Sequence, residues 1–283
     1  MRGAGSRLFF YAISAEYQPL YFCALMSYIT ILEFHQTEFS MISLENKVVV
    51  ITGGGRGIGA AIGRQFAGES ARVVLASRNM ARLRQTALSL NLDKKNYLLV
   101  QADITVRSQM KKIIAATVEK FGRIDIFINN AGVGIHKPIT ETTEKEFDTI
   151  FDTNLKAVYF SFLELIPLFR MQGGGQIINI SSGAGRMGVP GLAAYSSSKA
   201  ALNVFSEAVA GEVRNENIKI SVLAPASTDT GFMSNLSKKS KTPSKAALKL
   251  TVDEVAEAVV FLAKQNKNAW TSMADIRPLL INK

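Results

Sequence analysis

The stretch that decides the fold is Lys47-Val-Val-Val-Ile-Thr52-Gly-Gly-Gly-Arg-Gly-Ile-Gly59. Its apolar, β-branched half predicts a short buried strand, and its glycine-rich half predicts a tight turn that opens a helix. Glycines let the backbone turn sharply and approach a phosphate, while the first turn of a helix offers free N–H groups to an anion. A merely structural turn is the alternative, but the position between a strand and a helix favours dinucleotide binding.

Outward from that stretch, short β-branched runs alternate with amphipathic helical stretches, which is typical of a parallel sheet covered by helices. Strands are predicted at Lys47–Thr52, Arg72–Ala76, Tyr97–Gln101, Ile124–Asn129, Gln176–Ser181, Ile218–Leu223 and Met273–Ile276. Helices are predicted at Gly57–Ala67, Ala81–Leu90, Arg107–Phe121, Glu144–Phe151, Thr153–Met171, Tyr195–Asn215 and Val252–Lys264. No linker or repeat interrupts this part of the sequence. The predicted fold is α/β, a Rossmann-type doubly wound parallel sheet of about seven strands in a single domain, residues 44–283.

Cysteine and histidine are scarce, which excludes several mechanisms. The chain holds one cysteine, Cys23, and two histidines, His35 and His136. A disulfide within the chain is excluded, which is compatible with a reducing compartment. A Cys/His zinc site lacks ligands, so no metal site is predicted, and a Ser-His-Asp triad would depend on His136. We therefore expect catalysis from other residue types.

The chain is basic, with 33 Lys and Arg against 23 Asp and Glu and a net charge of +10. This charge suits nucleic acid, anionic lipid or a phosphorylated small molecule. One lysine cluster stands out, formed by Lys238, Lys239, Lys241, Lys245 and Lys249. It contains none of the aromatic residues that stack on bases, so it predicts a solvated segment and no nucleic-acid partner.

Residues 1–43 differ from the rest and are treated as an N-terminal extension. They are rich in aromatic residues, and their apolar run Pro19–Leu32 is 14 residues long, short of the ~20 needed to span a bilayer. An interfacial anchor or an organelle-targeting sequence is one interpretation, and translation from Met41 is another. The expected location is the cytoplasm, with membrane association or targeting through residues 1–40 as the alternative.

The end of the second predicted strand bears on the choice of dinucleotide. NAD-binding folds place an acidic residue about 20 positions after the glycine turn, where it binds the ribose 2′-hydroxyl. Here Ser77 and Arg78 occupy that place, and Arg56 lies within the turn. A carboxylate would repel a 2′-phosphate, whereas a guanidinium binds it through paired hydrogen bonds. The sequence therefore favours NADP(H) over NAD(H), although either arginine alone could be a solvated surface charge.

Over about residues 44–278 the sequence resembles the short-chain dehydrogenase/reductases, in the compact branch with a TGxxxGxG turn. The resemblance rests on Thr52–Gly59, on Asp103 and on Asn129-Asn-Ala-Gly132, followed in order by Asn154, Ser182 and Tyr195-Ser-Ser-Ser-Lys199. It implies the Asn154, Ser182, Tyr195 and Lys199 catalytic tetrad. It also implies a cofactor-binding set of Thr52, Gly53, Arg56, Gly57, Ile58, Gly59, Ser77, Arg78, Asp103, Asn130, Ala131, Gly132, Tyr195, Lys199, Pro225, Thr228 and Thr230.

The chemistry of the tetrad has a physical basis as well. Tyr195 and Lys199 are four residues apart, so on a helix they share one face. A neighbouring ammonium together with an oxidised nicotinamide is expected to favour the phenolate and so fit Tyr195 for proton transfer to or from a substrate oxygen. Ser182 would hydrogen-bond that oxygen, and Lys199 would hold the nicotinamide ribose. By resemblance, Asn154 would position a water that links Lys199 to solvent.

The sequence says less about the substrate-binding part of the site than about the cofactor-binding and catalytic residues. The family usually has Pro-Gly after the sixth strand, but this chain has Pro225-Ala226. Substrate selection is expected from Val133–Pro138, Gly183–Leu192 and Gly231–Lys249, where the apolar residues Met187, Val189, Phe232 and Met233 suggest a partly apolar pocket. The lysine-rich part could attract an acyl thioester on an anionic carrier, or simply face solvent.

The predicted function is reversible, NADP(H)-dependent reduction of a ketone or aldehyde, similar to 3-oxoacyl-carrier-protein reductases and carbonyl reductases. A hydroxysteroid- or retinoid-type alcohol dehydrogenase and a non-catalytic NADP-binding scaffold or sensor are the alternatives. The predicted helix Thr153–Met171 is apolar on more than one face, which favours self-association. A homodimer or homotetramer is therefore expected.

Overall fold

The computed structural model describes residues 41–230, 249–266 and 268–279. All of them except Met41 belong to one compact unit that begins at Ile42. The apolar run Pro19–Leu32, the residues Phe232 and Met233, and four lysines of the cluster (238, 239, 241 and 245) lie outside the described residues.

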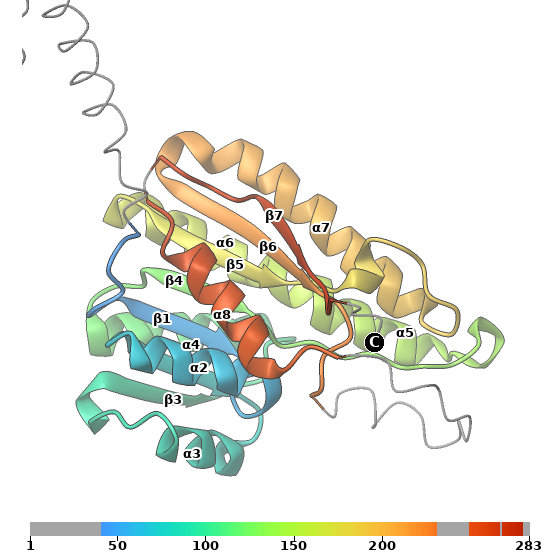
Figure 1. The fold of residues 1–283 in the computed structure, drawn as a ribbon, viewed down its shortest axis with the longest axis horizontal. Coiled ribbons are helices and arrows are strands. Elements are labelled where there is room, and N and C mark those ends of the chain that lie inside the picture. The colour runs from blue at the N-terminus through green and yellow to red at the C-terminus, as the bar shows by residue number, and fades with distance from the viewer. Residues whose placement is uncertain (1–40, 231–248, 267, 280–283) are drawn as a thin grey trace, which may run out of the picture. The chain divides into compact units, whose positions relative to one another are not determined.

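A seven-stranded, fully parallel sheet forms the centre of the fold, in the order β3-β2-β1-β4-β5-β6-β7 (Figure 1). The strands are β1 (Val48–Thr52), β2 (Arg72–Ser77), β3 (Tyr97–Gln101), β4 (Ile126–Asn129), β5 (Gly175–Ile180), β6 (Ile218–Pro225) and β7 (Met273–Ile276). The order reverses between β1 and β4, which is the switch point where such sheets bind ligands. The predicted α/β fold is confirmed, and strand bounds differ from the predicted ones by no more than two residues.

Helices cover both faces of the sheet. They are α2 (Gly57–Gly68), α3 (Met80–Leu88), α4 (Arg107–Phe121), α5 (Glu144–Phe151), α6 (Ala157–Gln172), α7 (Ala193–Val213) and α8 (Val252–Ala263). One core layer joins the sheet to α2 and α8 and includes Ile51 and Phe66, while the other joins it to α4, α6 and α7 and includes Val50 and Phe162. Because neighbouring side chains of a strand point to opposite faces, the continuous apolar run of β1 supplies both layers.

The chain between α5 and α6 differs from the sequence prediction. Two helices separated at residue 152 were expected, but a π-helical turn, Asp152–Lys156, connects α5 to α6 without a break. Such a turn inserts an extra residue into the helical ladder and re-aims the side chains within it, often at functional sites. Here it carries Asn154, whose side chain is buried.

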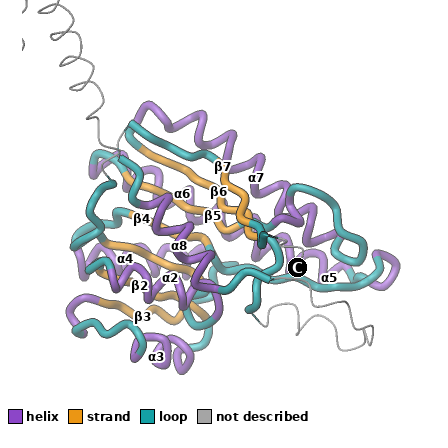
Figure 2. Tube along the Cα trace, viewed as in Figure 1, coloured by secondary structure: helices purple, strands orange, loops and turns teal. Residues whose placement is uncertain are grey.

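The loops that follow the strands gather at one end of the sheet (Figure 2). At that end the register pairs Thr52 with Ala76, Asn129 with Asn179 and Pro225 with Ile276. Residues distant in sequence therefore meet at a common edge. Among the described residues, no helix has the length and apolar character needed to cross a membrane.

Candidate active site

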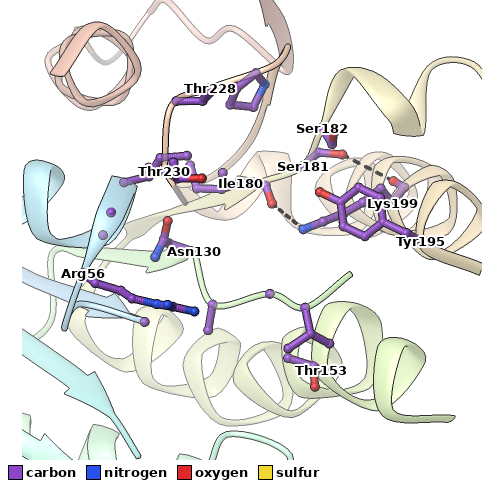
Figure 3. A pocket seen from close by; sticks show the side chains of 18 of the residues that line it. Arg56, Asn130, Thr153, Ile180, Ser181, Ser182, Tyr195, Lys199, Thr228 and Thr230 are labelled. Carbon is purple, nitrogen blue, oxygen red and sulfur yellow. Dashed lines mark hydrogen bonds between the residues drawn. The ribbon is translucent and has the colours of Figure 1, made fainter. Parts of the chain in front are cut away.

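A pocket of about 580 Å³ runs along the carboxyl edge of the sheet, from the end of β2 to the first turns of α7 and the end of β7. Its volume lies within the ~300–1,000 Å³ of small-molecule sites. Every predicted site residue lines it except Thr52 and Asn154. Figure 3 shows Tyr195, Lys199 and Ser182 at one end and Arg56 at the other, with Asn130 between them.

The glycine turn is held close to the end of β4. Gly53 has φ +69° and Gly57 has φ +56°, a region that favours glycine. A Cβ on Gly59 would lie 2.5 Å from both Asn130 Nδ2 and Gly53 O. Glycine is therefore required at residues 53 and 59 so that the turn can close against Asn130.

Thr52 lies behind the pocket and joins two strand ends. It is fully buried; its Oγ1 accepts hydrogen bonds from the backbone N–H groups of Asn130 (3.1 Å) and Ala131 (3.2 Å) and donates one to Ile128 O (3.2 Å). Asn130 Nδ2 donates in turn to Thr52 O at 2.8 Å. The arrangement supports the pocket wall.

Polar side chains surround the pocket beyond β2 and β3. Asp103 Oδ1 accepts from Thr105 N (3.0 Å) and Thr105 Oγ1 (2.7 Å), and Arg78 lies 4.0 Å from Asp103 Oδ2. Arg82, which is not among the predicted site residues, also lines this end. It lies in the first turn of α3, close enough that a Cβ on Gly55 would be 3.2 Å from Arg82 Cβ. The sequence signal that could have identified Arg82 is a basic residue shortly after a strand that ends without an acidic residue.

Tyr195 and Ser182 meet at the other end. Ser182 follows β5, and its Oγ accepts a hydrogen bond from Ala184 N at 3.2 Å. Burial raises the pKa of the Tyr195 phenol above its ordinary value, and a hydrogen bond with Ser182 opposes part of that rise. The sequence predicts a phenolate favoured jointly by the Lys199 ammonium and an oxidised nicotinamide. In the structure, removal of the phenol from water is the larger influence on Tyr195 and raises its pKa.

Lys199 is almost fully enclosed. Its side chain emerges from α7 one turn after Tyr195, and Nζ donates to Ile180 O at 2.8 Å (Figure 3). Burial lowers the pKa of this ammonium to about 8. A cation is thus held in a site where ionisation is costly, as happens at functional sites.

Asn154 connects three segments behind the pocket. Its Oδ1 accepts from Val133 N, its Nδ2 donates to Val133 O, both at 2.9 Å, and Nδ2 also donates to Ser198 Oγ at 3.0 Å. The π-helical turn, the loop after β4 and α7 are therefore tied together. A Cβ on Gly132 would be 3.2 Å from Asn154 Oδ1 and 3.6 Å from Lys199 Nζ, so both side chains lie close to that glycine.

Comparison with known proteins identifies the family. The profile of the short chain dehydrogenase family matches residues 47–241. The chain belongs to the short-chain dehydrogenases. An uncharacterized oxidoreductase of Staphylococcus epidermidis is 30% identical over 239 residues, which cover 84% of this chain and 100% of that protein. One from Staphylococcus saprophyticus is 29% identical over 240 residues, with the same coverage.

Solved structures of short-chain dehydrogenases share the fold. Levodione reductase superposes with a TM-score of 0.78 at 28% identity, over 82% of this chain and 96% of that one. The 3-ketoacyl-(acyl-carrier-protein) reductase of Brucella melitensis, solved with NADH, gives 0.74 at 33% identity, over 83% and 98%. A metagenomic short-chain oxidoreductase solved with NADP gives 0.72 at 32% identity, over 84% and 100%.

In this short-chain dehydrogenase the loop after β6, which contains Ala226, borders the pocket. Pro225, Ala226, Thr228 and Thr230 line the pocket. Ala226 N donates to Ile276 O at 2.9 Å, and Thr228 Oγ1 donates to Ala226 O at 3.0 Å. These bonds anchor the segment to β7 without the glycine that is usual in the family.

Two of the three predicted substrate segments meet. Lys137 N donates to Gly191 O at 2.8 Å, and Gly191, at φ +77°, leaves space for the ring of His136, which a Cβ there would approach to 2.8 Å. Lys137 Nζ also pairs with Glu146 at 2.5 Å, which ties the same segment to α5. Val133, Met187, Val189 and Leu192 line the adjacent pocket wall.

Proposed function

We propose that this short-chain dehydrogenase is an NADP(H)-dependent oxidoreductase that reduces a ketone or aldehyde, or oxidises the corresponding alcohol. The observation that carries the proposal is one pocket with two chemically distinct ends. A half-buried Tyr195, hydrogen-bonded to Ser182 and adjacent to Lys199, occupies one end. Arg78 and Arg82, which follow the end of β2 where no acidic residue stands, occupy the other end.

The residues present fit a dinucleotide. Helix α2 is 12 residues long, with no acidic residue in its first turn and no side chain capping its N–H groups, so these groups can receive a pyrophosphate. The positive φ of Gly57 and the open space beside it, where a Cβ would meet nothing closer than 3.7 Å, leave room for close approach. The bound dinucleotide would supply the hydride.

The side chains at the Tyr195 end of the pocket would transfer the proton and stabilise the charge that develops on the substrate oxygen. Tyr195, kept protonated by its raised pKa, donates a proton to the substrate oxygen during reduction. Ser182 hydrogen-bonds the same oxygen as charge develops on it. Lys199 would hold the ribose of the dinucleotide. Asn154 fixes the backbone at Val133 and reaches Ser198, one residue before Lys199.

The choice of dinucleotide is tested by removing single arginines. Arg78→Ala and Arg82→Ala are each expected to raise the Kd for NADPH about 10- to 100-fold, because each removes a charged hydrogen bond to the 2′-phosphate. The Kd for NADH should change little. Fluorescence titration measures both constants. Arg84→Ala on the same helix is the control, since Arg84 is exposed and outside the pocket. Equal losses for both dinucleotides would refute NADP(H) preference.

We also propose self-association through α6 and α7. Tyr159 on α6 is 44% exposed and Val204 on α7 is 68% exposed. Beside them Phe205 packs against Phe162 and Tyr159, with ring centroids 5.4 and 6.4 Å apart. An exposed apolar surface of this kind marks an interface.

Sedimentation of the wild-type protein should therefore show a dimer or tetramer. Val204→Glu is expected to shift it toward monomer, because a carboxylate would be buried unpaired in the contact. Leu88→Glu places the same charge on the exposed end of α3 and should leave the assembly intact. A wild-type protein that sediments as a monomer at micromolar concentration would contradict the proposal.

A further inference from the structure

Arg277 is a charged lining residue that the proposed chemistry does not use. It follows β7, is exposed, and lines the pocket. It makes no ion pair or hydrogen bond within the part of the chain that the structure describes. The sheet order places β7 at the edge opposite β2 and β3, so Arg277 is remote from the arginines proposed to bind the 2′-phosphate.

The surroundings place Arg277 near the reacting end. Ile276 O accepts from Ala226 N, and a Cβ on Gly183 would lie 3.6 Å from Ala226 Cα. The end of β7 is thus next to the loop after β6, which in turn contacts the residue after Ser182. On the strand itself, Arg186 contacts Met273 and Asp275, which alternation places on the same side as residue 277.

Nearby carboxylates already have cationic partners. Asp275 Oδ2 lies 3.5 Å from Arg186 Nε, and Asp229 Oδ1 lies 3.9 Å from Lys249 Nζ. The other pocket-lining cation at this end, Lys199, is buried and bonded to Ile180 O. The charge of Arg277 is therefore uncompensated at the rim of the substrate region.

We propose that the substrate carries an anionic group, a carboxylate or a phosphate, away from its reacting carbonyl, and that Arg277 binds this group. A guanidinium presents a planar pair of donors that matches either anion. This inference rests on the proposed function, because it assumes that the carbonyl lies at Tyr195 and Ser182. It narrows the substrate to an anionic carbonyl compound.

The test compares substrates that differ only in charge. A 3-oxo acid is compared with its neutral methyl ester to test whether a carboxylate is recognised. A 3-oxoacyl thioester of 4′-phosphopantetheine is compared with that of pantetheine, which lacks the phosphate, to test whether a phosphate is recognised. Each is measured for KM in turnover at saturating NADPH and for Kd by calorimetry on the complex with NADP⁺. Calorimetry keeps the inference testable even if turnover fails, which would count against the proposed function alone.

Arg277→Gln is expected to weaken one anionic compound at least tenfold in KM and Kd while its neutral counterpart changes less than twofold. For Arg277→Lys, the KM and Kd of the anionic compound should lie between those of the wild type and of Arg277→Gln. The Kd for NADPH should not change in either variant. Arg84→Gln removes the same charge outside the pocket and should have no effect. The inference is overturned if wild-type protein binds both members of each pair equally, or if Arg277→Gln weakens both equally or only alters the oligomeric state.

A separate observation concerns Asn203, on α7 one turn after Lys199. Its buried amide accepts from Ser181 Oγ (2.5 Å) and donates to Gly185 O (3.2 Å), so it holds both sides of the short segment that contains Ser182. A Cβ on Gly185 would be 2.9 Å from Lys199 Cβ. We infer that Asn203 is a positioning residue that sets the distance between Ser182 and Tyr195.

Asn203→Leu keeps the side-chain size but removes both bonds. We expect kcat to fall at least tenfold, the NADPH Kd to stay within twofold, and the rising limb of alcohol oxidation to move to higher pH because the bond to Ser182 weakens. Ser206→Ala is the control, since it breaks the Asn179 Nδ2–Ser206 Oγ bond (2.8 Å) between the same strand and helix. A lower melting temperature with unchanged kcat and pH profile would show that Asn203 is merely structural.

Discussion

Replacing Tyr195 with phenylalanine is expected to lower turnover by about 10²- to 10⁴-fold, the usual contribution of a positioned acid or base. The ring remains in its half-buried place, so folding and NADPH binding should be preserved. Only the proton and the hydrogen bond with Ser182 are lost. Steady-state kinetics in both directions, together with a fluorescence titration of NADPH, measure the two effects separately.

The pH dependence of the wild-type enzyme has a defined sign. Burial holds the pKa of Tyr195 above its ordinary value, so the phenol is protonated throughout the neutral range. Carbonyl reduction, which uses the protonated form, should therefore fall only in strongly alkaline solution. Alcohol oxidation, which uses the phenolate, should rise over the same range.

Tyr97→Phe is a suitable control, because Tyr97 lies on β3 outside the pocket. It should leave turnover and both pH profiles unchanged. If Tyr195→Phe retained more than a tenth of the wild-type rate, Tyr195 would not be the acid–base group, and the proposed chemistry would lose its proton donor.

The second large effect is on stability. Lys199→Met is expected to abolish turnover yet raise the free energy of unfolding near pH 7 by roughly 1–3 kcal/mol. The ammonium has a pKa of about 8 in the folded protein against 10.5 as the ordinary value, and each pKa unit corresponds to ~1.4 kcal/mol. Loss of the Nζ–Ile180 O hydrogen bond offsets ~1 kcal/mol of the gain.

The sign of this effect follows from proton linkage. Between about pH 8 and 10.5 the unfolded chain binds more protons at Lys199 than the folded chain does, so wild-type stability rises with pH across that window. Below pH 8 the full penalty is present. The stabilisation by Lys199→Met should thus be largest below pH 8 and vanish near pH 10.5.

Urea unfolding at pH 7 and pH 10 measures this difference. Lys219→Met is the contrasting variant, because Lys219 Nζ donates to Gln265 O (3.3 Å), Ala269 O (2.8 Å) and Asn266 O, and its removal should destabilise the fold. A Lys199→Met protein less stable than wild type at pH 7 would contradict a strained, buried ammonium.

Periodic patterns explain why the fold could be predicted. The seven strands and their helices follow from runs of β-branched residues and helical spacing, which depend on local sequence. The π-helical turn at Asp152–Lys156 could not be predicted, because the apolar spacing on either side of it is ordinary. Its cause is tertiary, since Asn154 reaches Val133 and Ser198 across the fold.

The predicted site residues were brought together at one edge because parallel strands end together. The sequence could not show how far each site side chain is removed from water. No sequence pattern shows that enclosure of the Tyr195 phenol raises its pKa. Arg277 was missed because only the folded strand order places it at the pocket, whereas Arg82 could have been found as a basic residue shortly after a strand that ends without an acidic residue.

The central claim is that the chain transfers hydride between NADPH and a carbonyl carbon. The most direct measurement incubates the enzyme with NADPH deuterated at the transferable C4 position and a panel of anionic and neutral ketones and aldehydes, and analyses the products by mass spectrometry. Wild-type protein is expected to place one deuterium on the carbinol carbon, and this signal should be lost with Tyr195→Phe. Tight NADPH binding without deuterium in any product would contradict it, and would instead favour a non-catalytic NADP-binding scaffold or sensor.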